Sequence, residues 1–93
     1  MIVSVRDKRL LEIAAGRLPK RFPAELAVVV ERRLKALEYA AKITDLLVPT
    51  GHRLEALRGD RAGQHSIRVN AQWRICFRWA EDGAHDVELV DYH

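Results

Sequence analysis

The chain ends in Asp91, Tyr92 and His93, residue types that can exchange protons with a bound reactant. Residues two apart in a strand project to the same side, so we expect the Asp91 carboxylate and the His93 imidazole to lie together, with Tyr92 on the opposite side. A carboxylate beside an imidazole is a suitable acid–base pair. The alternative is that the chain end frays and His93 is a solvated tail.

A second group of candidates consists of arginines. Arg74 and Arg78 alternate with apolar residues in one predicted strand, and Arg68 lies in the strand before it. We expect these guanidiniums to share the surface near Asp91 and His93, where an anion such as phosphate would relieve their mutual repulsion. Alternatively, Asp86 and Glu88 of the next predicted strand neutralise them. Both interpretations stay open for Arg78, whereas phosphate contact is favoured for Arg74.

These residue types suit one class of reaction. Cleavage of an RNA strand without a metal needs a base for the 2′-hydroxyl proton, an acid for the leaving oxygen and cations for the crowded phosphorus. The charge distribution is compatible with a nucleic-acid partner: residues 1–51 hold ten cations and six anions, residues 52–78 hold six arginines and two acids, and residues 79–93 hold five acids without Lys or Arg. An ordinary charged surface is the alternative.

Length and composition exclude several other classes. Ninety-three residues, 48% of them apolar, predict a single domain over 1–93. One cysteine excludes an internal disulfide framework, and the four scattered histidines lack the spacing of metal ligands. We therefore expect no metal and no cofactor. Because apolar stretches are far shorter than the ~20 residues of a membrane span and no signal peptide is visible, we expect a soluble cytoplasmic protein without membrane contact.

The elements that must position the candidates follow from hydrophobic periodicity. Steps of three and four residues predict helices over 8–15 and from Pro23 to about Ala41, and Ile43 to Val48 adds a helical turn. After Gly51 the period changes to two. The predicted strands are a short opening strand at 2–5, then 53–58, 64–70, 73–79 and 86–92, with reversing loops at 59–63 and at Asp82-Gly83.

The alternation over 73–79 also predicts the layers. Trp73, Ile75, Phe77 and Trp79 share one face, which we expect the helices to cover, so the tryptophans are interpreted as core and not as a base-stacking platform. The predicted fold class is α+β, with two N-terminal helices packed on one face of a twisted, mainly antiparallel sheet. Cys76 is expected to be a small thiol on the sheet surface. No chemistry is assigned to His52, His65 or His85.

Three blocks in fixed order support a family resemblance: Gly59-Asp60-Arg61, Trp73-Arg74-Ile75 and the terminal Asp91-Tyr92-His93. With them the chain resembles the HigB toxins of the RelE/ParE toxin superfamily over essentially its whole length. The resemblance implies a RelE/ParE-like toxin of a type II toxin–antitoxin system. Such toxins enter the ribosomal A site on the 30S subunit and cleave the mRNA there without a metal. It also implies a HigA-like helix-turn-helix antitoxin, through which alone operator DNA is contacted.

The resemblance also implies catalytic or RNA-binding roles for individual residues. Asp91, Tyr92 and His93 match the catalytic terminus, with Asp91 or His93 as base or acid and Tyr92 orienting or stacking on a nucleotide. Arg74 matches the arginine that contacts the scissile phosphate. Arg58 stands where relatives often have lysine, which retains phosphate contact but not proton donation. The expected RNA-binding or phosphate-binding residues are Arg58, Arg68, Gln72 and Arg78, and Gln72 replaces an asparagine of some members.

Two other functions share much of this pattern. A ParE-like toxin that inhibits DNA gyrase would have the same fold, but it needs no acid–base terminus, and the ending Asp91-Tyr92-His93 argues against it. A non-catalytic RNA-binding protein would use the arginines for phosphates alone. Because residues 79–93 are acidic, we expect an acidic antitoxin to cover the basic helices or the arginine surface instead.

Overall fold

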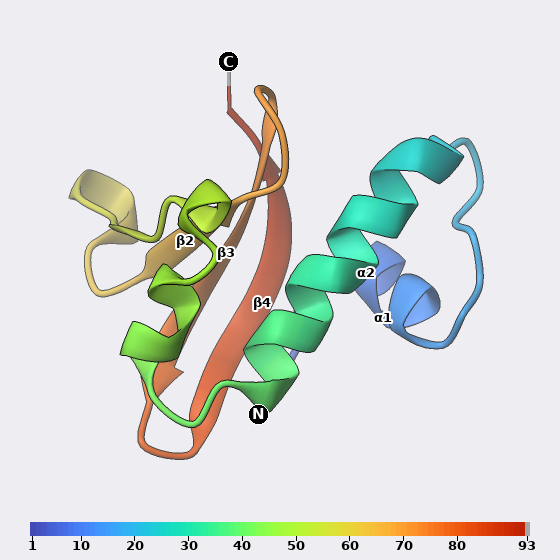
Figure 1. The fold of residues 1–93 in the computed structure, drawn as a ribbon. Coiled ribbons are helices and arrows are strands. Elements are labelled where there is room, and N and C mark those ends of the chain that lie inside the picture. Colours follow the sequence, from blue (N-terminus) through green and yellow to red (C-terminus); the bar gives the residue numbers. More distant parts are fainter. Residues whose placement is uncertain (93) are drawn as a thin grey trace.

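The computed structural model describes residues 1–92, which form two α-helices followed by a four-stranded sheet (Figure 1). Helix α1 spans Lys8–Ala14 and α2 spans Ala24–Tyr39, close to the predicted ranges. The strands are β1 Glu55–Ala56, β2 His65–Arg68, β3 Trp73–Ala80 and β4 Gly83–Asp91, and the short 3-10 helices are η1 Ile43–Leu47, η2 Thr50–His52 and η3 Gly59–Arg61. The predicted α+β class is confirmed.

Local signals set the ends of the helices. The Asp7 carboxylate accepts a hydrogen bond from the backbone N–H of Arg9 at 3.1 Å and thereby caps the start of α1. Gly16, with φ of 82°, follows its end and adopts the left-handed conformation that glycine tolerates best. Helix α2 begins directly after Pro23, and its buried residues recur at helical spacing: Leu26, Val30, Leu34 and Leu37.

The four strands lie in the order β1-β2-β3-β4 and every neighbouring pair is antiparallel, as predicted. Two expected strands are much shorter than predicted. The opening segment makes only isolated parallel bridges, Ile2 with Ala84 and Val5 with Val87. The predicted strand 53–58 shrinks to the two residues of β1. At its start, Arg53 adopts a left-handed φ of 46° that is incompatible with extended backbone, and after its end the chain enters η3 at Gly59.

The core fills the space between the sheet and the helices. Figure 1 shows α1 and α2 together on one side of the sheet, and we call the sheet face toward them the inner face. Ile67, Ile75, Phe77, Val87 and Leu89 of the strands join the buried stripe of α2 in one cluster. Trp73 and Trp79 are partly buried against this cluster, which confirms the core interpretation of the tryptophans. No helix among residues 1–92 is both long and apolar enough to cross a membrane.

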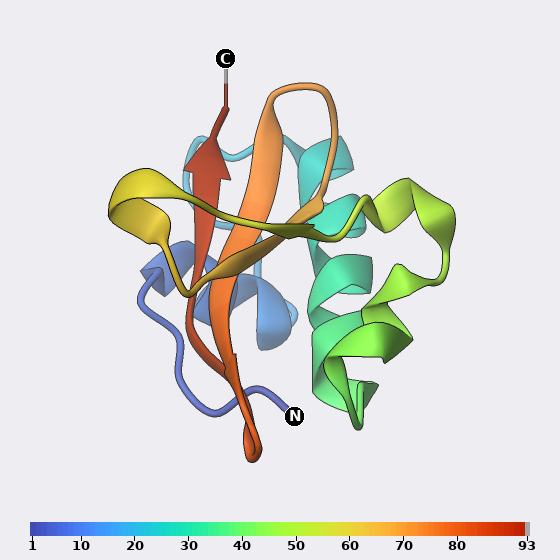
Figure 2. The same cartoon turned by 90° about the vertical axis from the view of Figure 1, so that its left-hand side faces the viewer.

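An irregularity in β4 decides which of its side chains share a face. The pairing of β3 with β4 shifts between Cys76 and Arg78, and Asp86 adopts a positive φ of 54° there. An extra residue in one strand restarts its alternation. Beyond this bulge, Val90 pairs with Arg74. The last residues of β4 run beside the loop that joins β2 to β3, at the end marked C in Figures 1 and 2.

Candidate active site

The sheet face turned away from α1 and α2, which we call the outer face, carries the predicted arginines of β2 and β3. Arg68 and Arg74 are direct partners across these strands, and directly paired residues of an antiparallel ladder share a face. Arg78 is on the same side of β3 as Arg74, four residues along the strand. The prediction that the three guanidiniums belong to one surface is therefore confirmed.

Arg74 is the most firmly held of these arginines. Its Nε donates to the Ser66 hydroxyl at 2.7 Å, and its Nη2 donates to the Arg53 carbonyl at 2.6 Å. Nη2 is also 3.9 Å from a carboxylate oxygen of Glu55, and the Arg74 side chain is only 12% exposed. Ser66 is fully buried beneath it. These contacts fix the direction of the guanidinium plane before any ligand arrives.

Tyr92 lies on the outer face beside Arg74. The guanidinium carbon of Arg74 is 6.0 Å from the centroid of the Tyr92 ring, a distance at which a cation is attracted to the ring face. The Tyr92 hydroxyl is 3.9 Å from the sulfur of Cys76. Burial and the neighbouring Cys76 raise the pKa of Tyr92, so its hydroxyl stays protonated at neutral pH and is available as a donor.

Cys76 is a buried group and not the surface thiol that we expected. It points to the outer face, but Tyr92 lies against it and its exposed fraction is zero. Burial raises the pKa of the Cys76 thiol, which keeps it protonated and a weak nucleophile at neutral pH. The aromatic side chain at the chain end, which sequence periodicity alone did not assign to this face, accounts for the difference.

The expected position of Asp91 is wrong. Asp91 pairs with Trp73, an inner-face residue, whereas Val90 pairs with the outer-face Arg74. Tyr92 is therefore the terminal side chain beside the arginines, and Asp91 lies on the other side of the strand. The physical reason is the two-residue period of a strand: Glu88 and Asp91 are an odd number apart and cannot both face the arginines. His93 lies outside the described residues.

Gln72 holds the end of β4 in place. Its side-chain nitrogen donates to the Asp91 carboxylate at 3.1 Å, and its backbone carbonyl accepts the Tyr92 N–H. Asn70 orders the same loop, since its side-chain oxygen accepts the N–H groups of Gln72 and Trp73 at 2.8 Å each. These bonds position the terminus relative to Arg74. The RNA contact expected for Gln72 stays a prediction.

The remaining predicted phosphate contacts are more exposed. Arg78 is an exposed residue whose Nε lies 3.7 Å from an Asp86 carboxylate oxygen, so the predicted neutralisation by a cross-strand acid does occur for this arginine. Arg58 is exposed at the start of η3, and Arg68 is half-buried. Phosphate contact by Arg58, Arg68 and Arg78 stays a prediction.

Sequence reasoning missed several residues beside the site. Glu55 approaches Arg74 from β1, and Arg61 reaches Glu88 from η3 with 3.5 Å between Nη1 and Oε2. Glu88 itself was expected near the arginines, but the two-residue β1 and the loop holding Arg61 left no periodic pattern from which Glu55 and Arg61 could be assigned to the site. Among residues 1–92, no group of three or more His, Cys, Asp or Glu side chains is arranged to hold a metal ion.

The arrangement is suited to binding a phosphodiester. A fixed guanidinium, Arg74, offers donors to non-bridging phosphate oxygens, and the neutral phenol of Tyr92 offers another donor or a stacking surface. Because Arg74 is already oriented, little reorganisation is required when negative charge develops on the phosphate. The outer face can therefore stabilise charge during cleavage of a nucleic-acid backbone.

Comparison with known proteins identifies the family. A family model described as the RelE-like toxin of the type II toxin–antitoxin system HigB matches residues 6–93. Endoribonuclease HigB of Proteus vulgaris is 33% identical over 93 residues, which is the full length of both proteins. Toxin HigB-1 of Vibrio cholerae is 39% identical over 59 residues, covering 63% of this chain but only 62% of the Vibrio protein. An uncharacterized protein of Haemophilus influenzae is 28% identical over 74 residues, 80% of this chain and 73% of that protein. Since the family model matches nearly the whole chain, from Arg6 just before α1 to residue 93, this protein belongs to the RelE-like HigB toxins of type II toxin–antitoxin systems.

Proposed function

We propose that this toxin is an endoribonuclease that cleaves mRNA in the ribosomal A site and thereby inhibits translation. The observation that carries the proposal is the anchored guanidinium of Arg74 beside the Tyr92 ring, on a sheet face that α1 and α2 leave uncovered. The full-length similarity to a protein named Endoribonuclease HigB supports it. So small a site benefits from the ribosome, which would hold the message in line for attack.

The chemistry requires no group beyond the side chains near the terminus. A base removes the proton of a ribose 2′-hydroxyl, whose oxygen attacks the adjacent phosphorus. The bond from phosphorus to the 5′-oxygen breaks, and an acid returns a proton to that oxygen, leaving a 2′,3′-cyclic phosphate and a 5′-hydroxyl. Arg74 stabilises the charge on the phosphate oxygens. Tyr92 donates a hydrogen bond or stacks on a base.

We assign direct proton transfer to His93 and a positioning role to Asp91, because the fold places the Asp91 carboxylate on the other side of the strand from Arg74. Asp91 lies on the Trp73 side of β4 and accepts a hydrogen bond from Gln72, so it holds the terminus in place. His93 directly follows Tyr92 and is the candidate for direct contact with the reacting oxygens. Whether His93 acts as base or acid is decided by the pH profiles of its variants.

The antitoxin partner follows from family membership, and its docking surface is part of the proposal. We propose a HigA-like antitoxin with a helix-turn-helix domain, which carries the contact with operator DNA. It covers the basic helices or the outer face and avoids the acidic residues 79–93. A cytoplasmic site of action follows from a ribosomal target. A complex in which the antitoxin touches only residues 79–93 would contradict this surface.

Primer extension on a defined mRNA in a purified translation system tests the function. Wild-type protein is expected to cut within A-site codons and to leave naked RNA intact. Arg74→Ala and His93→Ala are expected to lose cleavage, whereas Arg32→Ala, an exposed change on α2, retains it. If wild-type protein binds ribosomes and leaves the mRNA whole while it blocks gyrase supercoiling, the gyrase-directed alternative is correct.

A further inference from the structure

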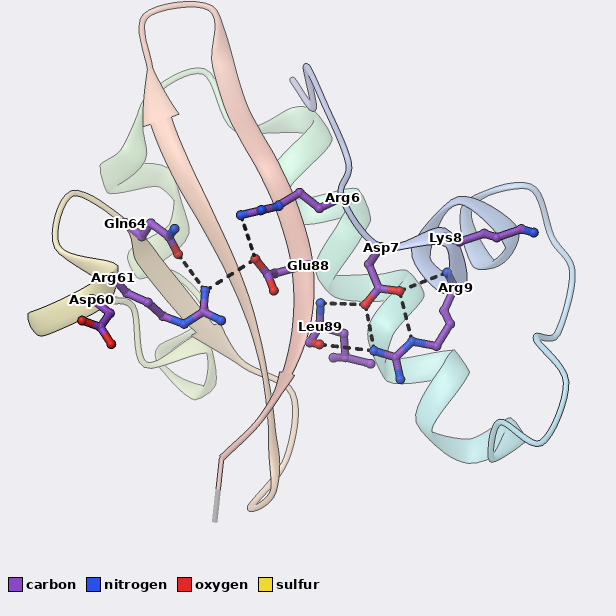
Figure 3. Close-up of a pocket in the computed structure, with 9 residues that line it drawn as sticks. All are labelled: Arg6, Asp7, Lys8, Arg9, Asp60, Arg61, Gln64, Glu88 and Leu89. Atoms are coloured by element: carbon purple, nitrogen blue, oxygen red, sulfur yellow. Dashed lines mark hydrogen bonds and ion pairs between the residues drawn. The ribbon is translucent and has the colours of Figure 1, made fainter.

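An open pocket of about 740 Å³ lies beside β4, at the edge of the outer face. Figure 3 shows its charged side chains arriving from three segments: the residues before α1, the residues around η3, and β4 itself. The apolar contribution comes from Leu89, and the other lining residues are charged or are glutamine. Such a lining suits an ion or a charged polymer and not an apolar ligand.

Two guanidiniums converge on one carboxylate in this pocket. Nη1 of Arg61 is 3.5 Å and Nη1 of Arg6 is 3.7 Å from the same Glu88 oxygen, and Figure 3 shows both side chains pointing toward Glu88 from opposite sides. Gln64 orients Arg61 by accepting a hydrogen bond from Nη1 at 3.0 Å. Since one negative charge faces two positive charges, the cluster retains a net positive charge.

The neighbouring ion pair of Asp7 and Arg9 is an example of a carboxylate whose hydrogen-bonding capacity is well used, and it serves as a comparison. Asp7 accepts two hydrogen bonds from Arg9 side-chain nitrogens at 3.0 and 2.8 Å and one from the Leu89 N–H at 3.2 Å. The contacts of Arg6 and Arg61 to Glu88 are longer than that, and the Arg6 side chain is 61% exposed. A guanidinium has five N–H donors, so both arginines retain donors for an incoming anion.

The pocket adjoins the candidate active site through the pairing of β3 with β4. Glu88 is the cross-strand partner of Cys76, whose sulfur is 3.9 Å from the Tyr92 hydroxyl, and Glu88 is also the residue that Arg61 contacts at 3.5 Å. Positive charge therefore extends across the outer face from Arg74, past Tyr92, to Arg61 and Arg6. A polymer with regularly spaced negative charges would satisfy this row.

We propose that Arg6 and Arg61 form a second phosphate-binding site, which holds the RNA backbone next to the phosphate at Arg74. Glu88 keeps the two guanidiniums in position while the site is empty. Guanidinium forks match phosphate oxygens, and the near absence of apolar lining disfavours a docked protein segment. The inference rests on the proposed function only in that RNA is the ligand; it does not require cleavage.

Binding of a fluorescein-labelled single-stranded RNA carrying 2′-O-methyl groups, which block cleavage, tests the site by anisotropy. Arg6→Ala is expected to weaken binding roughly 3–10-fold and to reduce the slope of log affinity against log salt by about 0.7, the value for one lost phosphate contact on a single strand. Arg6→Lys retains most of the affinity. The matched control, Arg32→Ala, removes an exposed arginine from α2 and leaves affinity and slope unchanged.

Glu88→Gln is expected to change RNA affinity in the opposite direction to Arg6→Ala. It removes the competing negative charge from between Arg6 and Arg61, so RNA is expected to bind more tightly, whereas a purely structural ion pair would yield no gain. The proposal would be overturned if Arg6→Ala, Arg32→Ala and wild type had equal affinities both for the oligonucleotide and for vacant 30S subunits. Unchanged RNA binding together with weaker binding of Arg6→Ala to polyglutamate would also overturn it, since the pocket would then serve an acidic protein.

Binding of Arg6→Ala to vacant 30S subunits shows whether the bound phosphate belongs to ribosomal RNA or to the message. If Arg6→Ala loses affinity for the subunits but not for the oligonucleotide, the phosphate belongs to ribosomal RNA. If it loses affinity for both, the message is bound there as well. If wild-type protein binds RNA through Arg6 but never cuts ribosome-bound mRNA, this site stands and the proposed nuclease function fails.

Discussion

The inner and outer faces of β3 are covered in different ways, the inner face by helices and the outer face by single side chains. Ile75, Cys76 and Phe77 are all fully buried, although they point alternately to the two faces. On the inner face, helices α1 and α2 cover Ile75 and Phe77 with apolar side chains. On the outer face, single side chains, Arg74 and Tyr92, lie over Cys76 and its neighbour on β2.

The difference explains where chemistry is possible. Apolar packing has no directional requirement and supplies most of the stability. The outer cover consists of a guanidinium and a phenol, which need directed contacts, and those contacts orient the groups for a ligand. A face covered by side chains instead of helices remains open to a polymer such as RNA. Substitutions on the two faces should therefore affect different properties.

The largest expected effect lies on the inner face. Phe77→Ala should lower the free energy of unfolding by about 3–5 kcal/mol, because it leaves a cavity at a fully buried site. Urea denaturation measures this loss. Val28→Ala, at a residue that is 53% exposed on α2, is the control and should change stability by less than about 0.5 kcal/mol. Equal losses for both variants would show that the inner face is not the main source of stability.

The next effect concerns activity on the outer face. Arg74→Ala should reduce ribosome-dependent cleavage about 10²–10³-fold, the usual cost of removing one group that stabilises a developing negative charge. Arg74→Lys should recover only part of the rate, since an ammonium cannot reproduce the contacts with Ser66 and Arg53. Single-turnover rates at saturating toxin measure both. Full activity of Arg74→Ala would remove the central residue of the proposed site.

Asp7 tests the connection between α1 and β4. Burial opposes ionisation, but the hydrogen bonds from Arg9 and Leu89 outweigh it and hold the pKa of Asp7 below its ordinary value. Asp7→Ala should cost about 1–3 kcal/mol, since it removes a helix cap and leaves buried donors unpaired. Asp7→Asn retains the cap and should cost less. Thermal unfolding near neutral pH distinguishes them, and equal losses would show that the charge, not the cap, carries the effect.

A smaller effect should depend on pH. His52 is buried, which lowers its pKa, although a hydrogen bond between its Nδ1 and the Leu46 carbonyl partly opposes the change. The unfolded state therefore binds the proton more readily. This contribution to stability is complete above the unfolded pKa of about 6.5 and is lost as pH falls toward the folded pKa. Urea midpoints at a series of pH values should fall in this window for wild type and less steeply for His52→Gln. Parallel profiles would exclude His52 as the cause.

The smallest expected effect is that of an exposed ion pair on the outer face. Arg78→Ala removes the 3.7 Å contact with Asp86 and should change stability by only about 0.2–1 kcal/mol. If Arg78 also contacts RNA, the anisotropy assay should show a smaller salt slope while stability barely changes. An unchanged slope would leave Arg78 as a neutralised surface residue, the other interpretation of the sequence pattern.

Much of the fold was predictable from periodicity. The three- and four-residue steps identified α1 and α2 to within a residue or two, and the alternation from Trp73 to Trp79 identified the face that the helices cover. The start of the predicted strand 53–58 was misplaced because the left-handed conformation of Arg53 is invisible to a hydrophobic pattern. The bulge at Asp86 was missed for the same reason: it depends on a backbone angle and not on residue type.

The sequence predicted which residues belong to the candidate site better than it predicted where their side chains lie. The terminal residues and Arg74 were chosen by type and by family resemblance, and the structure brings Tyr92 and Arg74 together. Asp91 was expected on the wrong side, because the alternation of β4 was not followed through to the chain end. Arg61 was quoted only as part of the Gly59-Asp60-Arg61 block and Arg6 was not considered, so neither was expected to bind phosphate; they lie in a loop and before a helix, far apart in the sequence.

The amino-acid sequence alone determined the class of fold, the two layers, the concentration of arginine in residues 52–78 and the membership of the HigB family. These depend on residue type and on local period, which the chain carries wherever it folds. Only the tertiary structure decided that Arg74 is anchored, that Tyr92 and not Asp91 joins it, and that Arg6 and Arg61 share Glu88. Those are relations between distant segments, set by strand register and loop conformation, which local patterns do not encode.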